Sequence, residues 1–132
     1  MNITWLGHSG FRIEIEGAVL LVDPWFEGNP MFPGERRAEA VAGATHVLVS
    51  HGHGDHATGA PAICRELGIP AVGIFDLMSW WEGHHGIETI GFNKGGTDSP
   101  AVGRGDPRER RSAFEDLEHR GLLAEQVGGR AG

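Results

Sequence analysis

The residues best suited to chemistry lie in one short segment, residues 51–56, which reads HGHGDH. Imidazole nitrogens and carboxylate oxygens are ligands for zinc, manganese and iron. The segment contains no cysteine, which argues against a structural zinc finger. The sequence therefore predicts a site for a divalent metal ion. The alternative is a polar surface loop whose histidines are fortuitous.

The spacing of these ligands predicts how they divide between metal positions. In an extended backbone the side chains of His51 and His53 point the same way, so both imidazoles can reach one ion. The two intervening glycines allow the chain to bend sharply. Such a bend brings Asp55 and His56 to a second point close by.

The elements that must position this segment are short strands and helices. Residues 2–6 are rich in apolar and β-branched side chains, and residues 11–16 alternate apolar with polar side chains, as a strand with one wet face does. Residues 17–18 are a predicted turn into residues 19–22, a run typical of a buried strand. Together these segments predict an antiparallel meander.

Further along the chain, predicted helices alternate with predicted strands, which indicates an α/β sheet. These elements are a short helix at 35–41, a strand at 46–50, a helix at 57–67 that ends at Gly68, a strand at 71–74, a helix at 76–82 and a strand at 88–92. The HGHGDH segment thus follows directly on a strand, as a metal site requires.

Composition narrows the class of protein. The chain has 132 residues, enough for one domain, and its 11 basic against 18 acidic residues give a net charge of −7. That acidity argues against nucleic acid or an anionic membrane as a partner. No apolar run is long enough to span a bilayer, no signal-type segment follows Met1, and the lone Cys64 forms no internal disulfide. We expect a cytoplasmic protein that acts on a small-molecule substrate.

Residues 50–56 resemble the HxHxDH signature of the metallo-β-lactamase-fold hydrolases. Residues 4–10, TWLGHSG, and residues 21–24, LVDP, narrow the resemblance to small prokaryotic metal-dependent hydrolases related to L-ascorbate-6-phosphate lactonase. Residues 92–97, FNKGGT, also resemble that branch. The resemblance covers residues 1–97, roughly three quarters of the chain.

The resemblance implies an αββα sandwich with two metal ions, most typically zinc, at one edge of the sheets. His51 and His53 would hold the first ion, and Asp55 and His56 the second. A bridging water would attack a lactone or phosphoester-type bond, and Asp55 and His56 would act as catalytic residues by orienting that water.

Two residues outside the signature acquire roles from the same resemblance. Asp23 would orient a ligand histidine, although an aspartate before a proline can also simply end a strand and start a turn. His8 would lie near the site and contact the substrate.

The chain departs from the family after Gly96. Family members are longer, and their second half supplies a third histidine for the first ion, a bridging aspartate and a last histidine. Asp106 and His119 lie in sequence that does not match those strands. We therefore expect an N-terminal half-domain over residues 1–97 and an irregular, divergent tail over residues 98–132, in which residues 112–124 could form one helix. Truncation or a frameshift is the simplest account, with activity reduced or lost.

A half-sandwich leaves one face of its sheet uncovered. On the order of 1000 Å² of apolar surface is worth roughly 25 kcal/mol, more than a typical net stability of about 5–15 kcal/mol. Self-association could cover this face. The alternative to an enzyme is a non-catalytic metal-binding fragment that acts as a binding or assembly module. Trp80 and Trp81 are candidates for core packing or for a self-association surface.

Three other histidines are weaker candidates. His84 and His85 are expected at an exposed helix end, and His46 in a structural or exposed position at the start of a strand. Cys64 is expected on an apolar helix face, where its thiol is inert.

Overall fold

The computed structural model describes residues 1–93, so the predicted helix over residues 112–124 and the boundary at residue 97 lie outside the described residues. Strands and helices alternate through this part, and none of its helices is long and apolar enough to cross a membrane. In chain order the elements are β1 (Asn2–Trp5), β2 (Phe11–Ile15), β3 (Ala18–Val22), the 3₁₀ helix η1 (Gly34–Arg36), α1 (Arg37–Val41), β4 (His46–Leu48), α2 (Gly54–Ala57), α3 (Ala60–Leu67), β5 (Ala71–Ile74), α4 (Phe75–His85) and β6 (Thr89–Phe92).

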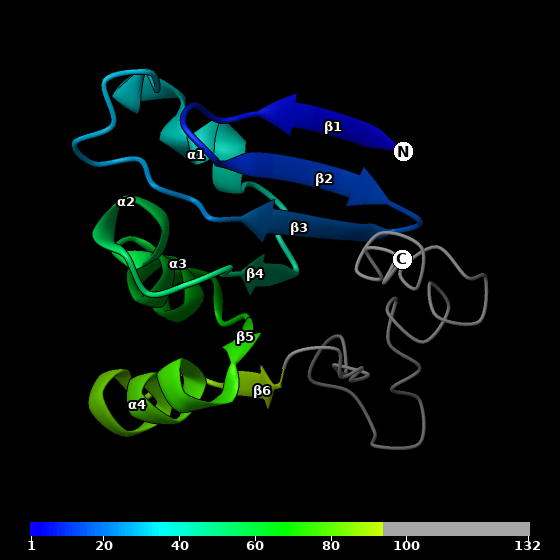
Figure 1. Ribbon diagram of the computed structural model, residues 1–132. Coiled ribbons are helices and arrows are strands. Elements are labelled where there is room, and N and C mark those ends of the chain that lie inside the picture. Colours follow the sequence, from blue (N-terminus) through cyan, green and yellow to red (C-terminus); the bar gives the residue numbers. More distant parts are fainter. Residues whose placement is uncertain (94–132) are drawn as a thin grey trace, which may run out of the picture.

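One mixed sheet contains all six strands, and their order across the sheet is their order in the chain (Figure 1). β1, β2 and β3 pair antiparallel, whereas β3 to β6 pair parallel. The connections explain the change, because a tight turn joins antiparallel strands and parallel neighbours need a crossover, here always helical. The predicted meander and the predicted α/β sheet are both confirmed.

The turn between β2 and β3 lies one residue earlier than predicted. Glu16 and Gly17 form it, with φ angles of 48° and 84°. Positive φ at both central residues matches the right-handed twist of the flanking strands. Ala18 belongs to β3 instead, because it pairs with Ile15 and is buried.

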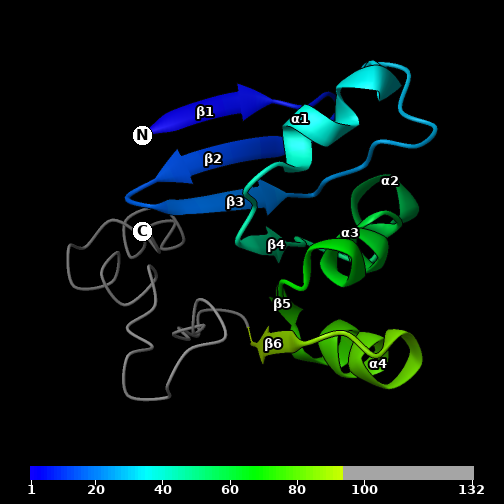
Figure 2. The same cartoon turned by 180° about the vertical axis from the view of Figure 1, so that it is seen from behind.

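The main core lies on the face of the sheet that the helices cover (Figures 1 and 2). Side chains from β3, β4 and β5 pack there against side chains from α3 and α4. Its most deeply buried members include Leu21, Val47, Ala71, Ile63 and Met78.

The opposite face carries a second apolar cluster to which, in the described part of the chain, only strands contribute. Ala18 and Leu20 are buried there, with Ile13, Ile15 and Leu48 packed around them. The alternation along each strand and the pairing register place Ile3, Trp5 and Ile74 on this same face, and all three are exposed. We call this surface the open face.

The helices differ from their predicted bounds in three places. The segment expected as one helix over residues 35–41 is the 3₁₀ helix η1 followed by α1. The helix expected over residues 57–67 begins only at Ala60, as α3, whereas Ala57 ends a separate short helix, α2, with Thr58 and Gly59 between the two. Gly59 faces the Pro24 carbonyl so closely that an added Cβ would lie 3.1 Å from its oxygen. α3 ends at Gly68 as predicted, in a left-handed conformation, and α4 continues beyond residue 82 to His85.

Burial settles several of the weaker candidates. His46 is fully buried, and this burial lowers its pKa to about 4, so it is neutral near pH 7. Burial of Cys64 raises the pKa of the thiol to about 12, which makes it inert as expected. Trp81 is a core residue, whereas Trp80 is exposed and stacks on His84.

Candidate metal centre

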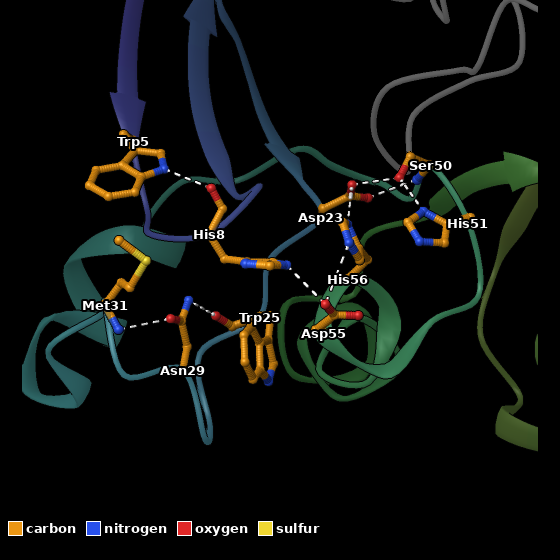
Figure 3. A network of polar contacts seen from close by, with 10 residues as sticks. All are labelled: Trp5, His8, Asp23, Trp25, Asn29, Met31, Ser50, His51, Asp55 and His56. Carbon is orange, nitrogen blue, oxygen red and sulfur yellow. Dashed lines mark hydrogen bonds and ion pairs between the residues drawn. The ribbon is translucent and has the colours of Figure 1, made fainter.

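The candidate site lies at the edge of the sheet where β3 and β4 end (Figure 3). Because these strands are parallel, Asp23, which follows β3, meets the segment that follows β4. β2 runs antiparallel to β3, so the connection between β1 and β2, residues 6–10, reaches the same edge. The carboxyl ends of parallel strands are the usual location of sites in open α/β sheets.

Asp23 is the centre of a hydrogen-bond network. Its carboxylate is buried and accepts hydrogen bonds from the Ser50 backbone N–H at 2.7 Å and from Ser50 Oγ at 2.6 Å. Its Oδ2 also lies 2.9 Å from His56 Nδ1. The backbone of Asp23 is left-handed, with φ 43°, a conformation that a residue other than glycine adopts at a free-energy cost.

This network fixes the tautomers of two histidines. An ionised carboxylate only accepts, so His56 carries its hydrogen on Nδ1. The hydroxyl of Ser50 gives its one hydrogen to Asp23 and therefore accepts from His51 Nδ1, 2.8 Å away. Both imidazoles are left with Nε2 as the atom able to bind a metal, and their ring centroids are 4.1 Å apart.

Asp55 faces His8 across the site. His8 Nε2 lies 2.9 Å from Asp55 Oδ2, and His56 Nε2 lies 3.8 Å from the same oxygen. Partial desolvation alone raises the pKa of Asp55. Hydrogen bonds from the backbone and from His8, with the attraction of His56, outweigh that effect and hold the pKa below its usual value.

His53 stands apart from the other candidate ligands. Its ring centroid is 4.7 Å from that of His51, yet His53 belongs to neither group of three ligand atoms that converge in residues 1–93. The chain does bend after His53, but the glycines are not the cause as expected. Neither Gly52 nor Gly54 has a positive φ, and the start of α2 just after His53 turns the chain.

The donor atoms fit a divalent cation. Two groups have ligand atoms within 4.8 Å of one another: His8, Asp55 and His56, and Asp23, His51 and His56. Both groups combine imidazole with carboxylate, the donor set of zinc, manganese and non-haem iron sites. Sharing of His56 places them side by side.

Sequence reasoning missed Ser50, which links Asp23 to His51. Its signal was a hydroxyl residue directly before the first histidine, but a serine at that position is unremarkable without the tertiary contact. The two histidines at the end of α4 take no part in the candidate site. His84 Nδ1 contacts the Trp80 carbonyl at 2.9 Å, and His85 lies beside Arg65.

The fold and the donor set together place the chain in a class, the proteins built on the metallo-β-lactamase fold. The described residues correspond to the N-terminal part of that fold. The profile of the beta-lactamase superfamily domain matches residues 2–116, and the chain belongs to this family.

Relatives and a solved structure agree. A UPF0173 metal-dependent hydrolase of Cereibacter sphaeroides is 70% identical over 97 residues, which are 74% of this chain and 42% of the relative. The UPF0173 metal-dependent hydrolase of Paracoccus denitrificans is 65% identical over 97 residues, again 74% of this chain and 42% of the relative. Igni18, a metallo hydrolase from the archaeon Ignicoccus hospitalis, superposes with a TM-score of 0.59 at 27% identity, over 71% of this chain and 40% of that one. The chain spans less than half the length of the curated relatives it matches.

Proposed function

We propose that this chain carries the N-terminal part of the metal site of a hydrolase that cleaves a lactone or phosphoester-type bond in a small molecule. The observation that carries the proposal is the Asp23–Ser50 network. It leaves Nε2 of both His51 and His56 available at one edge of the sheet. The names of the relatives, metal-dependent hydrolases, support the reaction class.

In this proposal His51 and His53 hold one ion, and Asp55 and His56 hold a second. Zinc suits these donors best, with manganese or iron as alternatives. A divalent cation supplies Lewis acidity and lowers the pKa of water near it. Asp23 keeps the hydrogen of His56 on Nδ1, so that Nε2 faces the site.

The catalytic roles fall to Asp55 and His56, which would orient the attacking water. Their side chains face each other at the site, with 3.8 Å between Oδ2 and Nε2. His8 lies beside them and borders the space in which a substrate would be held.

We further propose that this chain alone binds no more than one ion tightly and turns over slowly or not at all. In this assignment each ion has only two ligands among the described residues, fewer than the three protein ligands that usually hold a catalytic zinc. The test measures metal content of the purified chain with zinc, manganese and iron, together with hydrolysis of lactones and phosphodiesters. Two tightly bound ions with robust turnover would overturn the proposal.

A second candidate function is a non-catalytic binding or assembly module whose histidine cluster is a relic that no longer holds a metal ion, and the exposed Ile3, Trp5 and Ile74 on the open face favour it. Substitution of His51 and His53 by alanine separates the two candidates. Loss of bound metal supports the hydrolase site, whereas unchanged metal content favours the assembly module. His84→Ala is the matched control, because His84 lies on α4 outside both ligand groups.

A further inference from the structure

The loop between β1 and β2 holds His8 in an unusual conformation. Two backbone hydrogen bonds close the loop, from Leu6 N to Gly10 O at 2.8 Å and from Gly10 N to Gly7 O at 2.9 Å. Within it, Gly7 and His8 are both left-handed, with φ angles of 84° and 52°. A histidine pays a free-energy cost for this conformation, so its surroundings must hold it there.

Contacts from two sides hold the loop. Trp5 Nε1 donates a hydrogen bond to the His8 carbonyl at 2.9 Å. A Cβ on Gly7 would lie 3.1 Å from Asn29 and from the Met31 backbone, and one on Gly10 would lie 3.2 Å from the Asp23 carbonyl. The loop is therefore packed against both the segment after β3 and the centre of the site.

The same arrangement fixes the His8 ring. The His8 and Trp25 rings are nearly perpendicular, with centroids 5.3 Å apart and an interplanar angle of 80°. The centroid of the His56 ring lies 5.2 Å from that of His8, at an interplanar angle of 63°. Asn29 is buried and donates to the Trp25 carbonyl, which holds that residue in turn. The ring is thus aimed so that Nε2 reaches Asp55 Oδ2 at 2.9 Å (Figure 3).

Asp55 needs such a partner. Its side chain is 43% exposed, and it stands on α2, a helix of only 4 residues. An exposed carboxylate on a short helix samples several rotamers, and fixing one of them costs conformational entropy when a ligand binds. A partner that fixes the rotamer beforehand removes that cost.

We propose that His8 is a positioning residue that holds the carboxylate of Asp55 toward His56, rather than a residue that only contacts substrate. The inference rests on the proposed function, in which Asp55 and His56 share an ion. Residues that orient metal ligands typically change metal affinity 10–100-fold when they are removed.

The test uses His8→Gly, because glycine adopts the left-handed backbone freely and keeps the loop folded while the imidazole is lost. Zinc affinity is measured by competition with a chromogenic chelator. We expect an affinity roughly 10–100-fold weaker at unchanged stoichiometry. The melting temperature of the metal-free protein should not fall. A merely structural role would give the opposite split, a lower melting temperature and an unchanged affinity.

Three further variants complete the test. His8→Gln retains an N–H donor and should restore part of the affinity, and His84→Ala should change nothing. In an Asp55→Asn background, His8→Gly should add no further loss, because the group that His8 positions is already gone. An unchanged affinity in His8→Gly, or loss of one whole equivalent of zinc without rescue by His8→Gln, would contradict the proposal.

A metal-free measurement separates this inference from the proposed function. In ¹⁵N-histidine spectra at mildly alkaline pH, His8 should carry its hydrogen on Nε2 in the wild type and lose that preference in Asp55→Asn. Wild-type protein that binds no zinc refutes the proposed function. If the tautomer of His8 is the same in the wild type and in Asp55→Asn, the proposal that His8 positions Asp55 is refuted.

Discussion

Asp23 and His8 share a backbone conformation that side chains other than glycine rarely adopt. Each costs of order 1 kcal/mol or more, and such costs persist where the surrounding structure enforces them. Both residues lie on loops at the same edge of the sheet, and both direct a polar group at a ligand of the candidate site. Glu16, the third left-handed residue outside glycine in residues 1–93, belongs to an ordinary hairpin turn.

The first prediction concerns Asp23→Asn, which preserves shape and tolerates the left-handed backbone. An amide has one acceptor oxygen, so it cannot serve both Ser50 groups and His56 as the carboxylate does. We expect zinc affinity to fall roughly 10–100-fold. The free energy of unfolding should decrease by about 1–3 kcal/mol. Chelator competition and denaturant unfolding measure the two effects.

Glu16→Asn provides the control for backbone conformation. It changes a residue with nearly the same φ, 48°, at the far end of β2 and β3 from the site. Its zinc affinity should equal that of the wild type. Wild-type zinc affinity in Asp23→Asn would show that the carboxylate does not orient the ligands.

At the scale of elements, period-two alternation and apolar runs were sufficient to predict the strands. β2 and β3 begin or end within one residue of their predicted bounds, since alternation and burial are local properties of the sequence. The HGHGDH segment likewise predicted the types of the candidate ligands, and its predicted place directly after a strand is confirmed by β4. The antiparallel directions of β1 to β3 followed from the short connections between them, whereas the order of the strands across the sheet was not predicted.

What could not be predicted depends on contacts between distant segments. The break between α2 and α3 lies where Gly59 meets the Pro24 carbonyl, 35 positions earlier in the chain. The convergence of His8 on Asp55 spans 47 positions. No periodicity encodes either contact, so nothing in the sequence indicates that His8 pairs with Asp55 instead of substrate.

The second prediction compares two glycines, Gly83 in α4 and Gly91 in β6. A Cβ at Gly91 would lie 3.0 Å from Phe75 Cα, and backbone cannot move aside as a flexible side chain does. We expect Gly91→Ala to lower the free energy of unfolding by about 1–3 kcal/mol. Gly83, inside α4, has open space around it, so Gly83→Ala should raise stability by about 0.5–1 kcal/mol. Equal effects in denaturant unfolding would refute this account of the packing.

At the scale of the whole molecule, the open face is the main exposed apolar feature of the described sheet. Ile3, Trp5 and Ile74 are 57%, 53% and 42% exposed, and they flank a buried centre at Ala18 and Leu20. Patches of this kind mark interaction surfaces. We propose that a second copy of the chain covers this face.

The third prediction tests which face associates. Ile3→Glu places a charge on the open face without disturbing the helix-side core, and it should convert a dimer into a monomer. Trp80→Glu places the same charge on α4, on the helix side, and should leave the dimer intact. Light scattering after size-exclusion chromatography measures both. A monomeric wild type across concentrations, or a dimeric Ile3→Glu, would refute the proposal.

The order of strands has a consequence for synthesis on the ribosome. Each strand pairs with the one made just before it, so no strand waits for a later segment to insert beside it. His8, Asp23 and the segment ending at His56 all precede α3. Because domains assemble as the N-terminus emerges, the nascent chain can bring these residues together before β5 and β6 emerge from the ribosome. Loading with metal could therefore begin before the polypeptide is released.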